Sequence, residues 1–136
     1  MGIEFVEGAG NESLPEDFRP YVKEWFNDSF AGLSPPQKYS FELINRKENS
    51  LICAPTGSGK TLSAFLSVLD DLFGKGEDGE LEDRIYAVYV SPLRALNNDI
   101  ERNLQDPLEG IREKAEELDY DVPEVRSAVR TGDTTD

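Results

Sequence analysis

The sequence predicts an α/β fold in which helices flank a parallel sheet. Three observations lead to it: short, wholly apolar runs at residues 51–54 and 85–90, amphipathic segments around them, and a glycine-rich loop directly after the first run. Apolar runs that are bounded by turn residues suit strands buried on both faces. Strands that alternate with helices favour a parallel sheet with right-handed crossovers.

Residues 1–33 are expected to form a helical extension. Ser13 and Glu16 have the spacing of a capping box, and Pro15 suits the first turn of a helix. An apolar stripe at helical spacing follows, made of Leu14, Phe18, Val22, Trp25, Phe26 and Phe30. We therefore expect a helix over 14–30 that buries this stripe in a core.

The next segments lead into the glycine-rich loop. Ser34-Pro35-Pro36-Gln37 opens a second helix that should end near Arg46. Leu51 to Ala54 is then expected to be a buried strand, in which Cys53 is a small buried hydrophobe rather than a reactive thiol. A third helix is expected from Lys60 to Phe73.

The second half continues the alternation of strands and helices. Residues 74–83 form a glycine- and acid-rich loop that we expect to be mobile, and 85–90 are the second strand. Ser91-Pro92 begins a fourth helix, a further helix starts at Asp106, and 125–129 can form a third strand. The residues of the Asp106 helix that should point inward are Leu108, Ile111, Ala115 and Leu118.

The residue types of the chain exclude several classes of protein. With no His and one Cys among 136 residues, the chain has no internal disulfide, no Cys/His zinc site and no Ser-His-Asp triad of its own. A lone cysteine suggests a reducing, cytoplasmic setting. No apolar run approaches the ~20 residues that a membrane span needs, and the N-terminus lacks the pattern of a signal peptide, so no membrane partner is expected.

Acidic residues dominate the chain, with 28 Asp and Glu against 14 Lys and Arg and a net charge of −14. Such a surface resembles that of halophilic proteins and predicts stability that rises with molar KCl, because salt screens the repulsion between like charges. Two stretches are locally basic, 34–68 and 84–98. If the protein binds nucleic acid, these stretches are where it should do so.

The loop Ala54-Pro55-Thr56-Gly57-Ser58-Gly59-Lys60-Thr61 is the strongest functional signal and is typical of a P-loop, or Walker A motif, with Ala in place of the first Gly. Gly57 and Gly59 allow backbone N–H groups to face phosphate oxygens at a helix N-terminus. Lys60 should reach the β- and γ-phosphates, and the Thr61 hydroxyl should bind Mg²⁺, so both also serve the reaction. The expected nucleotide-binding residues of the loop are Thr56, Gly57, Ser58, Gly59, Lys60 and Thr61.

Four motifs in this order resemble those of superfamily 2 helicases. They are the P-loop, the segment 33–37 (LSPPQ) as a glutamine motif, 89–96 (YVSPLRAL) as motif Ia, and 130–134 (RTGDT) as a further segment that contacts nucleic acid. Together they are most similar to the large helicase-related (Lhr) family of ATP-dependent DNA helicases, over residues 20–136. The resemblance implies a RecA-like fold, with ATP and Mg²⁺ as ligands.

The resemblance also implies roles for residues outside the loop. Gln37 would hydrogen-bond the adenine edge; the alternative is that Ser34 and Gln37 form a capping box. Phe30 or Phe26 could stack on the base, although both also fit the core stripe. The residues implied to contact the nucleic-acid backbone are Arg94, Gly132 and Thr134.

Part of the helicase machinery has no match in this sequence. The family's motif II, an Asp-Glu pair that holds Mg²⁺, does not follow the P-loop, and a second RecA-like domain would be the partner that supplies arginine fingers. We therefore expect 34–136 to be an incomplete N-terminal RecA-like ATP-binding helicase domain, marginally folded or partly disordered, without ATPase or unwinding activity of its own. A fragment of a DEAD-box RNA helicase, or a nucleotide-binding module without catalysis, is the alternative.

Overall fold

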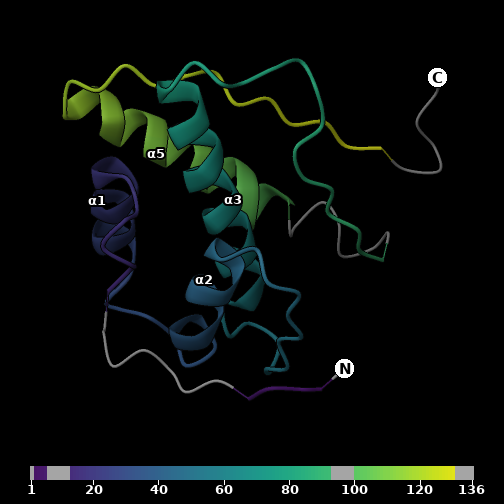
Figure 1. Cartoon of the computed structure of the whole chain (residues 1–136). Helices are drawn as coiled ribbons and strands as arrows, with labels where there is room; N and C mark the ends of the chain where they lie inside the picture. Colours follow the sequence, from purple (N-terminus) through teal and green to yellow (C-terminus); the bar gives the residue numbers. More distant parts are fainter. Residues whose placement is uncertain (1, 6–12, 93–99, 131–136) are drawn as a thin grey trace.

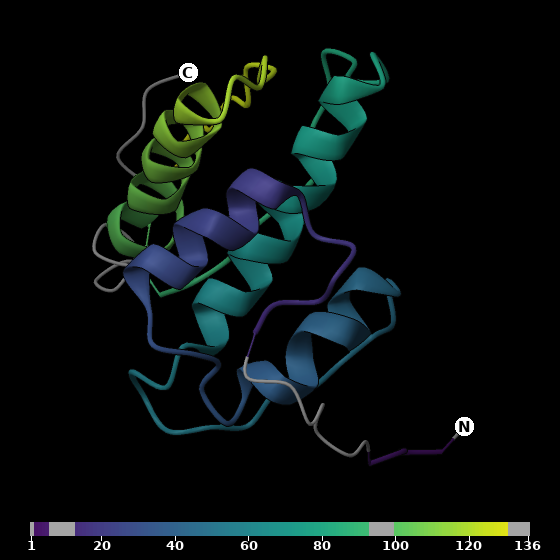
Figure 2. The ribbon, with the colours of Figure 1, turned by 90° about the vertical axis from the view of Figure 1, so that its left-hand side faces the viewer.

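The fold consists of helices packed around one long central helix. The computed structural model describes residues 2–5, 13–92 and 100–130, and the statements below concern these residues. α2 and the π-helical turn η1 pack against α3, and α1 packs against α5 (Figure 1). Turned by 90°, α1 crosses α3, with α5 on one side and α2 on the other (Figure 2). The elements are α1 (Pro20–Ser29), α2 (Gln37–Asn45), α3 (Lys60–Glu77), η1 (Glu101–Gln105) and α5 (Asp106–Glu117).

α1 is shorter than its apolar stripe predicts. It begins at Pro20 rather than near Leu14, because a residue before proline is restricted to extended backbone and Arg19 has φ −55° and ψ 140°. The Ser13–Glu16 pair therefore caps no helix, and α1 begins without a side-chain cap. Even so, Leu14 is buried in the core ahead of the helix.

α3 is longer than predicted, since it continues through Glu77 and the loop begins at Asp78. The sequence suggests a loop from Gly74 because glycine is a poor helix former. In the structure, side chains from residues far away in the sequence pack directly on Gly74 and Gly76, in the last turns of α3. A Cβ on Gly74 would lie 1.9 Å from Arg19 Nη2, and one on Gly76 would lie 2.0 Å from Pro123 Cγ.

α5 bears out its predicted stripe except at the end. Ile111 and Ala115 are fully buried, whereas Leu118 is 40% exposed because the helix ends at Glu117. The helix expected from Ser91-Pro92 falls mostly on 93–99, which lie outside the described residues.

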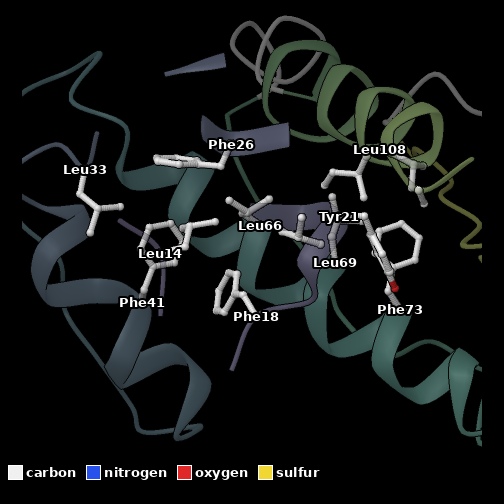
Figure 3. Close-up of a cluster of buried hydrophobic side chains, with 13 residues drawn as sticks. Leu14, Phe18, Tyr21, Phe26, Leu33, Phe41, Leu66, Leu69, Phe73 and Leu108 are labelled. Atoms are coloured by element: carbon white, nitrogen blue, oxygen red, sulfur yellow. The ribbon is translucent and has the colours of Figure 1, made fainter. Parts of the chain in front are cut away.

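The core joins residues from all parts of the helical framework (Figure 3). Phe18 and Phe41 meet edge to face with ring centroids 5.6 Å apart, and Tyr21 and Phe73 do so at 5.7 Å. Trp25 is partly buried and packs against this cluster. The buried members are Leu14, Phe18, Tyr21, Val22, Phe26, Leu33, Phe41, Leu66, Leu69, Phe73, Leu108, Ile111 and Ala115.

The segments predicted to be strands form no strand within the described residues. Residues 51–54, 85–90 and 125–129 have no regular secondary structure, and Leu51 is 90% and Val90 85% exposed. Cys53 is exposed, so its predicted burial is wrong. The physical reason is that a wholly apolar strand needs cover on both faces, and the helical part covers only single side chains here, where Tyr89 packs on Phe65 and Val125 on the core. The parallel sheet therefore remains a prediction, whereas the flanking helices are observed.

Candidate nucleotide-binding site

The phosphate loop depends on glycine at two positions. Gly57 has φ +78° and Gly59 has φ +84°, the left-handed region that other residues adopt only with strain. Gly59 is also the N-cap of α3, so the chain turns at this residue directly into the helix. The helix predicted to begin at Lys60 directly after the loop is confirmed, whereas the strand predicted ahead of the loop is not formed. The loop therefore meets the helix where the macrodipole favours an anion.

Gln37, for which the resemblance implies a contact with the adenine edge, is joined directly to the loop. Its side-chain Nε2 donates to the carbonyl oxygen of Gly59 at 3.2 Å, and its Oε1 accepts from the backbone N–H of Ser34 at 2.9 Å. The residue is 4% exposed. The second contact is one half of the predicted capping box.

Ser34 supplies a contact that the sequence did not reveal. In a complete capping box its hydroxyl would accept from the backbone N–H of Gln37. Instead, Ser34 Oγ donates to the carbonyl oxygen of Ser58 at 2.6 Å. Ser34 and Gln37 thus hold two successive loop carbonyls, those of Ser58 and Gly59. The glutamine motif marks this segment as part of the site, but the spacing of three residues between Ser34 and Gln37 predicts a helix cap rather than a contact with the loop.

The side chains of the loop are oriented by bonds within the loop. Lys60 Nζ donates to the carbonyl oxygen of Ala54 at 2.7 Å, and Ser58 Oγ donates to that of Pro55 at 2.5 Å. An ammonium group has three donors, and this carbonyl takes one of them. α3, all of whose residues are described, has no acidic residue in its first turn, so nothing there opposes an anion. Thr61 is half-buried in that turn.

The two aromatic candidates for base stacking differ in exposure. Phe26 is fully buried in the core, while Phe30, just after α1, is 41% exposed. The two rings lie 5.0 Å apart, and the Phe30 ring lies 5.9 Å from that of Trp25. Phe30 is therefore the one of the pair with an accessible ring.

The residues predicted to contact nucleic acid lie outside the described part of the chain. Arg94, Gly132 and Thr134 are outside the described residues. In the described part of the chain, no three His, Cys, Asp or Glu residues group as metal ligands. None of its helices has the length and apolar character needed to span a membrane.

Comparison with protein families identifies the chain's relatives. The family model for the DEAD/DEAH box helicase matches residues 34–131. The chain is 55% identical over 125 residues to the ATP-dependent helicase Lhr-Core protein 2 of Thermococcus barophilus, and 52% identical over 125 residues to the ATP-dependent helicase Lhr-Core of Methanocaldococcus jannaschii. Each match covers 92% of this chain but only 14% and 15% of the relative.

A solved structure agrees with these relatives. The structure of Mycobacterium smegmatis helicase Lhr bound to ssDNA and AMP-PNP matches with a TM-score of 0.73 and 41% identity, over 88% of this chain and 15% of that one. The resemblance to Lhr helicases, expected from four short motifs, is thereby confirmed.

Proposed function

The chain belongs to the DEAD/DEAH box helicase family, and on that premise we propose that it binds ATP with Mg²⁺ at the loop 54–61, as part of an ATP-dependent DNA helicase. The observation that carries the proposal is the attachment of Ser34 and Gln37 to the loop carbonyls of Ser58 and Gly59. A turn that only caps a helix has no need of this attachment. The attachment joins the Gln37 amide, which can recognise a base, to the loop backbone, which can bind phosphates.

The proposed roles follow from the chemistry of each group. Backbone N–H groups from Thr56 to Thr61 and the Lys60 ammonium bind the phosphates, and the Thr61 hydroxyl binds Mg²⁺. Gln37 selects adenine. An amide has two donor and two acceptor positions, and its two observed bonds use one of each. Phe30, with its accessible ring, is the proposed stacking residue.

The remaining parts of a helicase are proposals beyond this site. The chain spans about one-seventh of the curated relatives it matches, at 14% and 15% of their length. We propose single-stranded DNA as the partner of Arg94, Gly132 and Thr134, supported by the DNA-bound relative. Hydrolysis and strand translocation then need a second RecA-like domain, and this chain alone should turn over no ATP. A cytoplasmic location fits such a function.

Calorimetry with Mg²⁺·ATP tests the proposal on the full chain. The wild type should take up one nucleotide only when magnesium is present, and Lys60→Ala should weaken binding at least about tenfold, since a charge-assisted bond is lost. Lys47→Ala is the matched control, because this lysine pairs with Asp71 at 3.7 Å on the surface. Equal loss in the two variants, or no uptake by the wild type, would refute the assignment.

A further inference from the structure

A network centred on Arg19 joins the chain ahead of α1 to the far half of α3. The backbone N–H of Arg19 donates to Asp70 Oδ1 at 2.7 Å, and its guanidinium Nη1 lies 3.7 Å from Asp70 Oδ2. Arg19 Nε, itself buried, lies 3.5 Å from Glu77 Oε2. Tyr21 Oη donates to the other oxygen of Glu77 at 2.6 Å. Asp70 is only 7% exposed, while the side chains of Arg19 and Glu77 are 30% and 33% exposed, so the network is partly buried.

The backbone of α3 leaves room for the network. A Cβ on Gly74 would lie 1.9 Å from Arg19 Nη2 and 2.6 Å from Arg19 Cζ, so any other residue would displace the guanidinium. Glycine within a helix costs about 1 kcal/mol relative to alanine. The glycine thus lowers the stability of α3 at the position where the Arg19 guanidinium packs on it.

The segment 19–37 is therefore attached to α3 at both of its ends. One end is the Arg19 network, and the other is the pair of bonds from Ser34 and Gln37 to the phosphate loop. Asp70 is eleven residues beyond Gly59, about 16 Å along the helix, and α1, at ten residues, is about 15 Å long. The segment thus has the reach to connect the two attachments.

The middle of the segment is packed tightly between these ends. Tyr21, Phe26 and Leu33 follow one another through the core cluster, opposite Leu66 and Leu69 of α3 (Figure 3). Close-packed interiors shift as units rather than deform continuously. A displacement of one end along α3 is thereby transmitted to the other.

We propose that Arg19, held by Asp70 and Glu77, is a positioning residue for Gln37, which fixes the base-selecting amide relative to the phosphate loop. This inference rests on the proposed nucleotide site and adds a determinant of base selectivity about 16 Å along α3 from the loop. Arg19 acts only through the segment it anchors. The conformation of the phosphate loop is set by the left-handed Gly57 and Gly59, and Lys60 and Thr61 lie in the first turn of α3, so the anchor governs the choice of base more than the affinity for phosphate.

Two matched pairs of variants in the full chain test the proposal. Asp70→Ala removes the acceptor of Arg19, and its control Asp71→Ala removes a neighbouring carboxylate that contacts Lys47 and Lys75 instead. Gly74→Ala pushes the guanidinium away without removing any charge. Its control is Gly76→Ala on the same helix, where the new Cβ meets Pro123 instead of Arg19.

Two readouts are needed for each variant. Calorimetry with ATP, GTP and tripolyphosphate should show that Asp70→Ala and Gly74→Ala lower the ATP over GTP preference about tenfold, the worth of one hydrogen bond, with tripolyphosphate affinity kept within about twofold. In NMR spectra without nucleotide, the side-chain amide signals of Gln37 should shift and exchange faster in these two variants. Both controls should retain the wild-type preference and spectra.

The outcomes separate this proposal from the proposed function. An unchanged base preference in Gly74→Ala, or an equal loss in the controls, overturns the positioning role. If Asp70→Ala fails to fold, the Gly74 and Gly76 pair decides alone. If the wild type binds neither nucleotide nor tripolyphosphate, the proposed function fails, and the Gln37 amide signals still decide whether Arg19 positions that side chain.

Discussion

The helices and the segments predicted to be strands carry similar apolar side chains, yet their burial is opposite. Phe26 of α1 and Leu66 of α3 are fully buried, whereas Leu51 and Ile85 are 90% and 81% exposed. Both regions are apolar enough to form a core. The difference lies in the pattern of their apolar residues rather than in their amount.

The pattern decides what each region needs from the rest of the molecule. An amphipathic helix has one apolar stripe, which a single neighbouring helix can cover. A continuous apolar run has two faces, and it is buried only when strands lie beside it and layers cover it on both sides. The helices of this chain cover one another's apolar stripes. Residues 51–54 and 85–90 would need further strands and covering layers, which the described residues do not supply.

Truncating a core residue gives the largest expected effect and tests whether the helices hold the fold together. Phe26→Ala should lower the free energy of unfolding by about 3–5 kcal/mol, because it leaves a cavity in the cluster around Leu66. Urea denaturation followed by circular dichroism measures the change. A loss below about 1 kcal/mol would mean that this cluster does not hold the fold together.

The buried carboxylate within the helical half gives the next largest effect. Burial, the main cause, raises the pKa of Asp70 from 3.8 to about 6; the Arg19 backbone N–H and guanidinium lower it, while Asp17 and Asp71 raise it further. The folded state therefore holds the proton more tightly than the unfolded chain. Between about pH 4 and pH 6, the free energy of unfolding should fall as pH rises, by up to about 3 kcal/mol.

Asp70→Asn should remove this pH dependence, and Asp71→Asn should retain it. Denaturation curves of the three proteins at several values between pH 4 and pH 8 provide the comparison. At pH 8 Asp70→Asn should be at least as stable as the wild type, because it no longer buries a charge and Asn can still accept from the Arg19 N–H. Parallel pH profiles for Asp70→Asn and the wild type would contradict this account.

A third, smaller effect is expected where α5 meets α1. Ordinarily Gly→Ala within a helix stabilises by about 1 kcal/mol. At Gly110, however, the new Cβ would lie 2.2 Å from Trp25 Nε1, so Gly110→Ala should destabilise by about 1–2 kcal/mol and change the fluorescence of Trp25. A gain in thermal stability would show that the α1–α5 contact is loose.

The smallest effect should come from the segments predicted to be strands. Val88 is 77% exposed, so Val88→Ala should change the free energy of unfolding by less than about 0.5 kcal/mol in this chain. A cost near that of Phe26→Ala would break the comparison, since it would mean that 85–90 is covered in solution.

The sequence predicted those features that depend on local patterns. The buried stripe of α1, the start of α3 at Lys60 and the glycine turn before it follow from spacing and backbone conformation alone. The end of α3 could not be predicted, because glycine ordinarily disfavours a helix and the packing of Arg19 on Gly74 joins residues far apart along the chain. For the same reason, the bond from Gln37 to Gly59, across 22 residues, could not be read from a motif that also fits a helix cap.

Gly59 is constrained by two neighbouring side chains and by its own backbone conformation, which limits how this site can diverge. A Cβ there would lie 2.6 Å from Gln37 Nε2 and 3.2 Å from Ser34 Oγ, in a left-handed turn that already disfavours other residues. Positions 34, 37 and 59 should therefore vary together or not at all among related sequences. In a saturation library scored for nucleotide binding, single changes at Gly59 should be tolerated less than those at Gly57, which has no neighbouring atom within 4 Å of a Cβ.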